Sequence, residues 1–400
     1  METKYWKLTG APADAAALAE AGALVQAGEV VAFPTETVYG LGANALNPEA
    51  VAKIFAAKGR PQDNPLIVHI ARKEDINALT TGLNANARKI MEHFMPGPLT
   101  IIVPKAEIIP DVTSAGLDTV GVRFPINKYA QDFILACGCP IAAPSANISG
   151  RPSPTNAQDV LEDMQGKVAG ILDGGSCGVG LESTVVDTTS PVPTICRPGG
   201  VTYEMLTEVL GAVEIDPALL GDKSFKPKSP GMKYRHYAPK EPVYLLEGAA
   251  VDCLPTLVGK ALAAGLKVGV LCDEVMRQRL KQALGNEAVG AAAYGNVAVA
   301  GAAQAQLEHG DAAVQAHEER LLLSCWGDSR ERLAADLFYL LRDFDRTKPD
   351  VILAQGVSED GIGLAIMNRL RKAAGYQIIT LEKGVLTLKG DKQLPAFMIQ

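Results

Sequence analysis

The chain has 400 residues, of which 48% are hydrophobic and 21% charged, and its formal net charge is −7. So long a chain with an ordinary composition is typical of a folded protein with two domains. The negative charge argues against nucleic-acid binding as the main function, although a local basic groove remains compatible with it. No run approaches the roughly eighteen apolar residues of a membrane helix, and the start lacks the apolar segment of a signal peptide.

The cysteines and histidines are scattered. None of the seven cysteines forms a CxxC pair, which favours a reduced, cytoplasmic setting without structural zinc. The five histidines show no HExxH or other paired spacing, so we expect no metal site built from protein ligands.

The first half of the chain alternates apolar strand-like runs with helices. One helix is expected to begin at Asn47-Pro48 and to end near Gly59, since Asn is a good N-cap and Pro suits the first helical position. A second opens with a capping box at Thr155-Asn156, and a third covers about 203–210. Strands are expected at 29–33, 66–70, 99–103, 120–124, 141–143, 168–172, 184–187 and 194–197. This order predicts an α/β fold with a twisted, mixed sheet.

Residues 221–240 are rich in Pro, Gly and Lys and read as a linker. A second, smaller α/β domain of Rossmann-like type is expected from Val243, with strands at 266–272 and 351–355 and helices around 274–284 and 331–342. The Ala-rich stretch 288–316 reads as a strand and a helix of low complexity. We therefore predict a first domain at 1–220, a linker at 221–240, a second domain at 241–382, and a tail of uncertain order at 383–400.

Two short clusters carry the strongest chemical signal, Lys58-Gly59-Arg60 and Ser145-Ala146-Asn147. A Lys and an Arg two residues apart suit a polyphosphate, because they combine a point charge with a bidentate fork. Ser and Asn add neutral donors and acceptors. The alternative is a helix end with solvated cations and an Asx-type turn. Loop segments that together mix hydroxyls, glycines and an occasional Arg, at 34–42, 121–125, 182–187 and 197–200, lie at strand edges and favour a ligand cleft instead.

The familiar nucleotide and hydrolase motifs are missing. There is no P-loop, the glycine-rich stretch 173–180 lacks the GxGxxG order, and Gly361-Ile362-Gly363 is only a weak phosphate signal. Ser145 and Ser183 do not lie in GxSxG, which disfavours nucleophilic catalysis.

The Lys58–Arg60 and Ser145–Asn147 clusters, set among 34–42, 96–100 and 197–199, strongly resemble the YrdC/Sua5 family. Residues 229–239 resemble the linker of its two-domain Sua5 type, and the resemblance extends from about 10 to about 380. It implies a YrdC-like domain joined to a Rossmann-like domain. It also implies synthesis of L-threonylcarbamoyladenylate from ATP, L-threonine and bicarbonate, with release of pyrophosphate, for the t6A modification at position 37 of tRNA.

The resemblance also implies site residues. Catalysis and ATP binding are expected from Lys58, Arg60, Ser145 and Asn147, with Mg²⁺ bound through the phosphates. The threonine pocket is expected to contain Thr35, His69, Arg123 and Ser183, although a satisfied core histidine is an equal interpretation of His69. Further nucleotide contacts are expected from Thr119, Ser153, Arg197 and, in a lid over residues 229–239, from Tyr234 and Tyr237.

The expected partners are ATP, L-threonine, bicarbonate and a tRNA threonylcarbamoyl-transferase complex that receives the product. No membrane contact is expected, and direct RNA binding is expected to be weak or absent. Two alternatives stay open at this point. An RNA-binding module is disfavoured by the acidic charge, and a carbamoyl-transferring hydrogenase-maturation relative by the lack of paired CxxC motifs.

Overall fold

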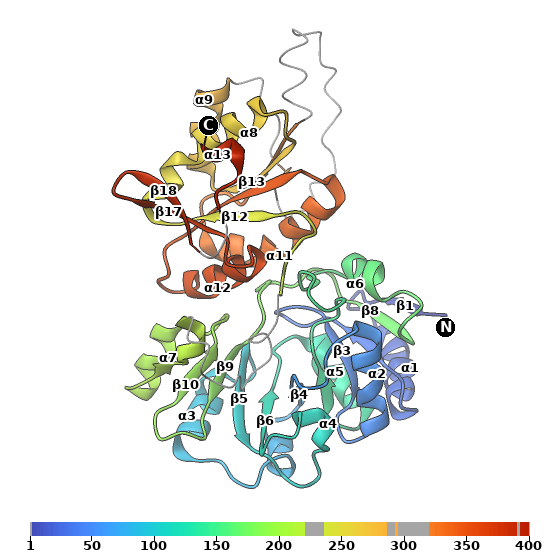
Figure 1. Ribbon diagram of the computed structural model, residues 1–400. Helices are drawn as coiled ribbons and strands as arrows, with labels where there is room; N and C mark the ends of the chain where they lie inside the picture. Colours follow the sequence, from blue (N-terminus) through green and yellow to red (C-terminus); the bar gives the residue numbers. More distant parts are fainter. Residues whose placement is uncertain (1, 221–235, 286–292, 295–319, 390–392, 400) are drawn as a thin grey trace. The chain divides into compact units, whose positions relative to one another are not determined.

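The computed structural model describes residues 2–220, 236–285, 293–294, 320–389 and 393–399 (Figure 1). The chain divides into two compact units. The first comprises Met1–Tyr234 with Asp360–Ala365, and the second Arg235–Glu359 with Ile366–Gln400. Residues 221–235, which include most of the predicted linker, and residues 286–292 and 295–319 of the alanine-rich region lie outside the described residues.

The described part of the first unit is built on an eleven-stranded sheet in the order β1-β8-β2-β3-β7-β4-β6-β5-β9-β10-β11. Parallel pairs such as β4 with β6 alternate with antiparallel pairs such as β5 with β6, so the sheet is mixed as the sequence predicts. The strands are β1 (Lys4–Lys7), β2 (Val31–Phe33), β3 (Gly40–Asn44), β4 (Ile67–His69), β5 (Leu99–Pro104), β6 (Thr119–Arg123), β7 (Ile141–Ala143), β8 (Gly170–Asp173), β9 (Thr184–Asp187), β10 (Thr194–Arg197) and β11 (Glu214–Ile215).

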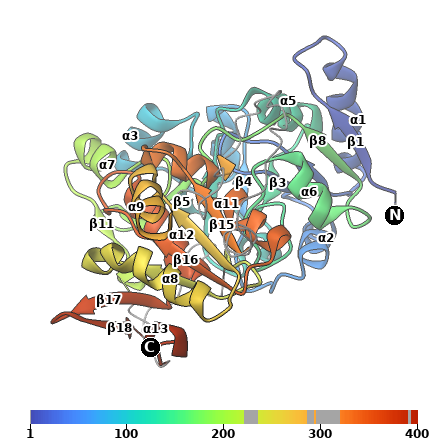
Figure 2. The same ribbon diagram turned by 90° about the horizontal axis from the view of Figure 1, so that it is seen from above.

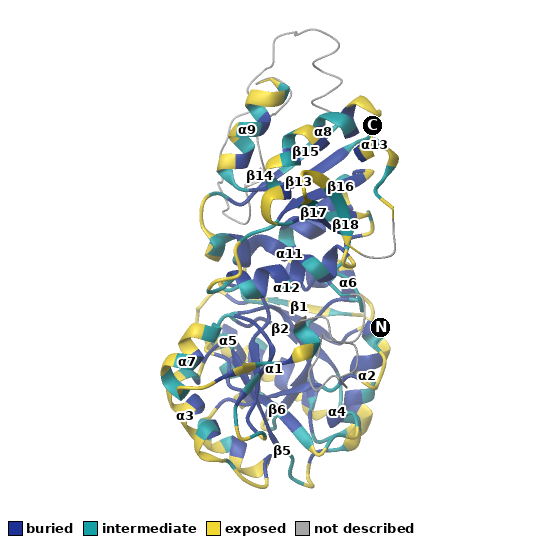
Figure 3. Cartoon of the chain, turned by 60° about the vertical axis from the view of Figure 1, so that its left-hand side comes forward, coloured by how far each residue is buried: buried dark blue, intermediate teal, exposed yellow. Residues whose placement is uncertain are grey.

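Helices flank this sheet and turn their apolar sides towards it, as the burial colours of α3 and α7 illustrate (Figure 3). The α-helices are α1 (Asp14–Gln26), α2 (Pro48–Lys58), α3 (Ala85–Phe94), α4 (Asp111–Ser114), α5 (Lys128–Cys137), α6 (Ala157–Met164) and α7 (Tyr203–Leu210), and the 3₁₀ helices are η1 (Lys73–Ala78) and η2 (Pro217–Leu220).

Helix α2 confirms the sequence prediction at both ends. The Asn47 side chain accepts hydrogen bonds from two backbone N–H groups of the first turn, and Pro48 occupies the first helical position. At the other end Gly59 takes a left-handed conformation with φ 61°, which lets the chain turn sharply. The helix therefore ends with Lys58 in its last turn, directly before a bend.

Two local predictions were wrong. Residues 40–42 were expected in a loop but belong to strand β3, whose two glycines leave room for the Phe33 ring. A Cβ at Gly40 or Gly42 would lie within 2.9 Å of that ring. Helix α6 has Asn156 as its N-cap, with the side chain accepting from Asp159 N, so the capping box did not start at Thr155.

The described part of the second unit has a seven-stranded sheet in the order β14-β15-β13-β16-β12-β17-β18. All neighbouring pairs are parallel except β17 with β18, which matches a Rossmann-like α/β fold. Its elements are β12 (Val243–Leu246), η3 (Gly248–Cys253), α8 (Leu254–Ala263), β13 (Val268–Cys272), α9 (Glu274–Leu284), β14 (Ala293–Tyr294), β15 (Leu321–Cys325), α11 (Arg330–Thr347), β16 (Val351–Gln355), α12 (Gly363–Ala373), β17 (Ile378–Glu382), β18 (Val385–Lys389) and α13 (Ala396–Ile399).

The segment expected as a tail contains secondary structure. Strand β18 pairs with β17 from Val385 to Lys389, and α13 packs beside α8 with Met398 buried in the core (Figure 2). Leu386 and Leu388 pack against the same core, so the alternation of apolar residues along β18 explains why this segment joins the sheet. Within the described residues, no helix is long and apolar enough to cross a membrane.

A glycine beside β9 gives a test of how tightly this part of the sheet is packed. A Cβ at Gly199 would lie 2.4 Å from the backbone of Glu182 and Thr184. We therefore expect Gly199→Ala to lower the free energy of unfolding by about 1–3 kcal/mol, because the strand ends must move apart.

The matched control is Gly82→Ala, since nothing lies within 4 Å of a Cβ there. Chemical denaturation of both variants measures the difference. Equal stability of the Gly199→Ala variant and the wild type would contradict the close approach.

Candidate active site

Lys58, from the first of the two clusters recognised in the sequence, contacts the second cluster, the 145–147 loop. Lys58 is only 2% exposed, and its ammonium donates to the backbone carbonyls of Ser145 and Asn147. The Asn147 side-chain oxygen is 3.4 Å from the same nitrogen and accepts from the Ser145 hydroxyl. A solvated helix end therefore does not describe Lys58, because its charge is buried and partnered by the 145–147 loop.

The 145–147 loop is itself fixed by hydrogen bonds on both sides. The Asn147 amide donates to the carbonyls of Ile148 and Arg151 at 2.8 and 2.9 Å. Ser149 N donates to the Lys58 carbonyl at 2.9 Å. Both the backbone and the side chain of Lys58, at the end of α2, are therefore hydrogen-bonded to this loop region. This arrangement preorganises the hydroxyl and amide groups next to a positive charge, as sites for anionic ligands require.

Arg60 and Thr119 lie beside the segment that precedes β4. The Arg60 guanidinium approaches the carbonyls of Asn64 and Pro65 at 3.4 Å each. Thr119 lines a small pocket on the sheet together with Pro65 and Thr100. Both predicted nucleotide-binding residues thus border the same stretch of chain.

Ser183, directly before β9, and Arg197, the last residue of β10, form a second buried cluster. Arg197 Nη2 donates to Ser183 Oγ and Arg197 Nε to the Ser183 carbonyl, each at 3.0 Å. The Ser183 hydroxyl is 2.8 Å from that of Thr100 on β5. Next to it, Ser153 donates to Glu182 at 2.6 Å. The structure thus joins Ser183 to Arg197, and Ser153 to the adjacent residue 182.

Arg123 and His69 are paired across neighbouring strands, at the last positions of β6 and β4. Arg123 is 4% exposed, and its Nη2 donates to Glu36 Oε1 at 2.6 Å. Thr35, next to Glu36, uses its hydroxyl within its own turn, donating to the Val38 carbonyl at 2.6 Å. The four predicted threonine-site residues therefore lie at the ends of β2, β4 and β6 and the start of β9.

His69 is a neutral side chain in this setting. Its ring is 3% exposed, and Nδ1 lies 3.2 Å from the Ile67 carbonyl. Burial, followed by the positive charge of Arg123, lowers the pKa of the imidazole to about 3. The ring can therefore contribute a hydrogen bond but no charge at neutral pH.

Three polar residues of the site escaped the sequence analysis as individual candidates, namely Glu36, Thr100 and Glu182. They lie in or beside segments recognised as rich in polar groups, but only the fold shows that each contacts a predicted residue. Tyr234 lies outside the described residues. Tyr237 belongs to the second unit, where its ring stacks on that of Phe338 with the ring centroids 5.0 Å apart.

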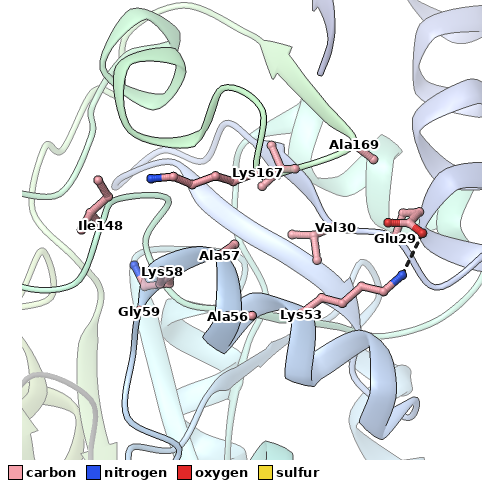
Figure 4. Close-up of a pocket in the computed structure, with 11 residues that line it drawn as sticks. Glu29, Val30, Lys53, Ala56, Ala57, Lys58, Gly59, Ile148, Lys167 and Ala169 are labelled. Atoms are coloured by element: carbon pink, nitrogen blue, oxygen red, sulfur yellow. Dashed lines mark hydrogen bonds and ion pairs between the residues drawn. The ribbon is translucent and has the colours of Figure 1, made fainter. Parts of the chain in front are cut away.

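A cavity of about 570 Å³ lies beside the last turns of α2 (Figure 4). Lys58, Ile148 and Lys167 line it, and Lys53 pairs with Glu29 at its edge at 2.7 Å. Ser145 and Asn147 are not among its lining residues. The cavity therefore borders the helix that carries Lys58 without containing the polar groups that the ammonium contacts.

Among the described residues, no group of three or more His, Cys, Asp or Glu side chains is arranged to hold a metal ion. The described cysteines are free thiols.

Comparisons with known proteins agree with this architecture. Residues 23–199 match a family described as "Telomere recombination", of the Sua5, YciO and YrdC proteins, and residues 201–375 match "Threonylcarbamoyl-AMP synthase, C-terminal domain". The chain is 45% identical to the threonylcarbamoyl-AMP synthase of Pyrococcus abyssi, over 88% of this chain and 92% of that protein. It is 43% identical to the Bacillus subtilis enzyme of the same name, over 95% and 100%.

A solved structure gives the same result. The crystal structure of P. abyssi Sua5 complexed with L-threonine superposes with a TM-score of 0.80 at 42% identity, covering 96% of this chain and 100% of that one. Fold and site thus define a two-domain α/β protein with a buried Lys–Ser–Asn cluster in its first domain. The chain belongs to the Sua5/YrdC family, in its two-domain Sua5 form.

The environment of His69 predicts an unusual titration. Because its pKa is about 3 in the folded protein and near 6.5 in an unfolded chain, the unfolded state binds the extra proton first. We expect His69 to contribute stability that is complete above about pH 6.5 and that falls as the pH drops towards about 3.

Nuclear magnetic resonance of the imidazole protons measures this directly, with a His69→Asn variant used to assign the signal. The His69 signal should not shift between pH 8 and pH 5. A midpoint near pH 6.5 in the folded protein would contradict the buried, neutral ring.

Proposed function

We propose that this chain is a threonylcarbamoyl-AMP synthase, which joins L-threonine, bicarbonate and ATP and releases pyrophosphate. The observation that carries the proposal is the buried Lys58 ammonium, held on the loop that presents Ser145 and Asn147. This cluster offers charge and directed donors but no activated nucleophile. It therefore suits a reaction between bound substrates better than one through a covalent enzyme intermediate.

The reaction needs two bond-forming steps. Bicarbonate loses hydroxide to give carbon dioxide, the threonine nitrogen forms a bond to its carbon, and the proton lost from nitrogen combines with the hydroxide as water, which leaves an N-carboxylate. An oxygen of that carboxylate then attacks the α-phosphate of ATP, the bond to the β-phosphate oxygen breaks, and pyrophosphate leaves. Such a transfer is accelerated mainly by alignment and by neutralising charge on the phosphates. Lys58 and Arg60 would balance the charge of the triphosphate, and Ser145 and Asn147 would orient the reacting groups.

The second group of residues suits the amino acid. Arg123 would bind the threonine carboxylate, which a guanidinium recognises in two-point fashion. His69, Thr35 and Ser183, which are neutral, would shape the pocket around the amino and hydroxyl groups of threonine. Thr119, Ser153 and Arg197 would contact the nucleotide.

Magnesium would accompany ATP. We propose an ion carried mainly by phosphate oxygens and water, to which the Ser145 hydroxyl oxygen can add a neutral ligand while its hydrogen stays on Asn147 Oδ1. When bound, the ion neutralises phosphate charge. The product is a mixed anhydride that would pass to a tRNA threonylcarbamoyl-transferase complex.

The proposed activity predicts a strict substrate requirement. Pyrophosphate release from ATP should depend on both L-threonine and bicarbonate, because the N-carboxylate is the attacking group. A coupled pyrophosphate assay measures this, and mass spectrometry identifies the threonylcarbamoyl adenylate. Equal release without threonine would rule the activity out.

The Lys58 cluster predicts a large effect of single substitutions. Lys58→Ala and Arg60→Ala should each lower turnover at least about tenfold, since a charge-assisted contact to phosphate contributes roughly 1.5–3 kcal/mol. Lys58→Met, which retains the aliphatic stem, should show the same loss.

The control is Lys53→Ala on the same helix, because Lys53 is exposed and pairs with Glu29 instead. It should keep wild-type turnover. Comparable turnover of the Lys58→Met variant and the wild type would show that the buried charge is not required.

A further inference from the structure

The ion pair between Glu36 and Arg123 is incomplete. Arg123 Nη2 and Glu36 Oε1 are 2.6 Å apart, and the two side chains are 5% and 11% exposed. Arg123 Nε and Glu36 Oε2 are both buried, and neither has a hydrogen-bond partner among the described residues. This nearly buried ion pair therefore keeps one buried donor, Arg123 Nε, and one buried acceptor, Glu36 Oε2, without a hydrogen-bond partner.

Leaving such atoms without partners is costly. A buried donor or acceptor that loses water without gaining another partner costs about 1–3 kcal/mol, and more when it is charged. Both groups belong to elements that hold them in place, since Arg123 ends β6 and the Glu36 carbonyl accepts from Val179 N at 2.8 Å. A bound ligand could therefore supply the two missing hydrogen-bond partners of this ion pair.

The chemistry of the two open positions specifies the ligand. Arg123 Nε–H calls for an acceptor, such as a carboxylate oxygen, and Glu36 Oε2 calls for a donor, such as an ammonium group. An α-amino acid carries these two groups on one carbon. The ion pair has no net charge and neither does the zwitterion, so their association buries no unbalanced charge.

We propose that Glu36 binds the α-ammonium group of the amino-acid substrate while Arg123 binds its α-carboxylate. This inference rests on the proposed function, and it adds a residue to the substrate site. Glu36 selects for the amine that the reaction must carboxylate, whereas Arg123 alone would accept any small carboxylate. His69, which pairs with Arg123 across the strands, is neutral and carries no charge for the ammonium group. The negative charge opposite the ammonium group therefore comes from the carboxylate of Glu36.

Calorimetric titration of the full-length protein without ATP tests this separately from turnover. The probes are L-threonine and 3-hydroxybutyrate, which has the same carboxylate and hydroxyl but no amine. The wild type should bind L-threonine at least tenfold more tightly than 3-hydroxybutyrate. This comparison needs no variant, and equal affinities would overturn the proposal.

Glu36→Gln provides the second arm. It should weaken L-threonine binding at least tenfold while leaving 3-hydroxybutyrate binding unchanged or tighter, because the competing anion beside Arg123 is gone. A matched control is Asp163→Asn, which neutralises another buried carboxylate paired with an arginine, Arg151, in the same unit. This control should bind L-threonine as the wild type does.

The remaining outcomes also decide the matter. Glu36→Gln protein that is folded, by thermal unfolding, and binds L-threonine within about threefold of wild type overturns the proposal. An equal loss of affinity for both probes also overturns it, since that result assigns Glu36 a purely structural role. Normal selectivity for the amine without pyrophosphate release would instead refute the proposed synthase function and leave the role of Glu36 intact.

Discussion

The first unit depends on one positive charge that is almost entirely buried, the ammonium group of Lys58. An ammonium group in an apolar interior is unfavourable unless oxygen atoms surround it, and Lys58 finds them on the 145–147 loop. That requirement ties three parts of the chain together. Helix α2 must end where it does, the loop must follow β7 closely, and Gly59 must reverse the chain. The hydroxyl and amide of the loop are then held in place as a consequence of satisfying one charge.

The same logic recurs at the ends of the neighbouring strands. Arg197 is paired with Ser183 and Arg123 with Glu36, and each guanidinium is nearly as buried as the ammonium of Lys58. A mixed sheet allows this crowding, because β4 and β6 run parallel while β5 runs against β6. Residues distant in sequence therefore meet at one place, and their mutual hydrogen bonds replace the water that an open cleft would supply.

Much of this architecture could be predicted from local patterns, and the failures have clear physical causes. Strands β7, β9, β10 and β16 and helices α7 and α9 have the expected bounds or nearly so, because apolar runs there end at Gly, Pro, Asn or Asp. Strand β3 was missed because glycine has a low strand propensity. Glycine is required at these positions because the Phe33 ring lies against them, which the local sequence does not show. Strand β1 was missed because Lys4–Lys7 forms an edge with few buried residues.

Some site residues could likewise be predicted from the sequence, whereas their contacts could not. Lys58, Arg60, Ser145 and Asn147 stood out because their types and spacing suit phosphate chemistry, but the carbonyl partners of Lys58 are backbone atoms that no sequence pattern displays. Glu36 was hidden in a hydroxyl-rich segment, since its importance appears only when β6 brings Arg123 beside it.

The way Lys58 is held also has a chemical consequence for a protein that makes a reactive anhydride. Amines attack mixed anhydrides, so a lysine beside such a product is at risk of being acylated by it. A primary amine is nucleophilic only through its lone pair, and a protonated nitrogen that donates to oxygens of Ser145 and Asn147 has none to offer. In the proposed reaction, this cage of oxygen atoms would therefore shield the Lys58 nitrogen from acylation by the product.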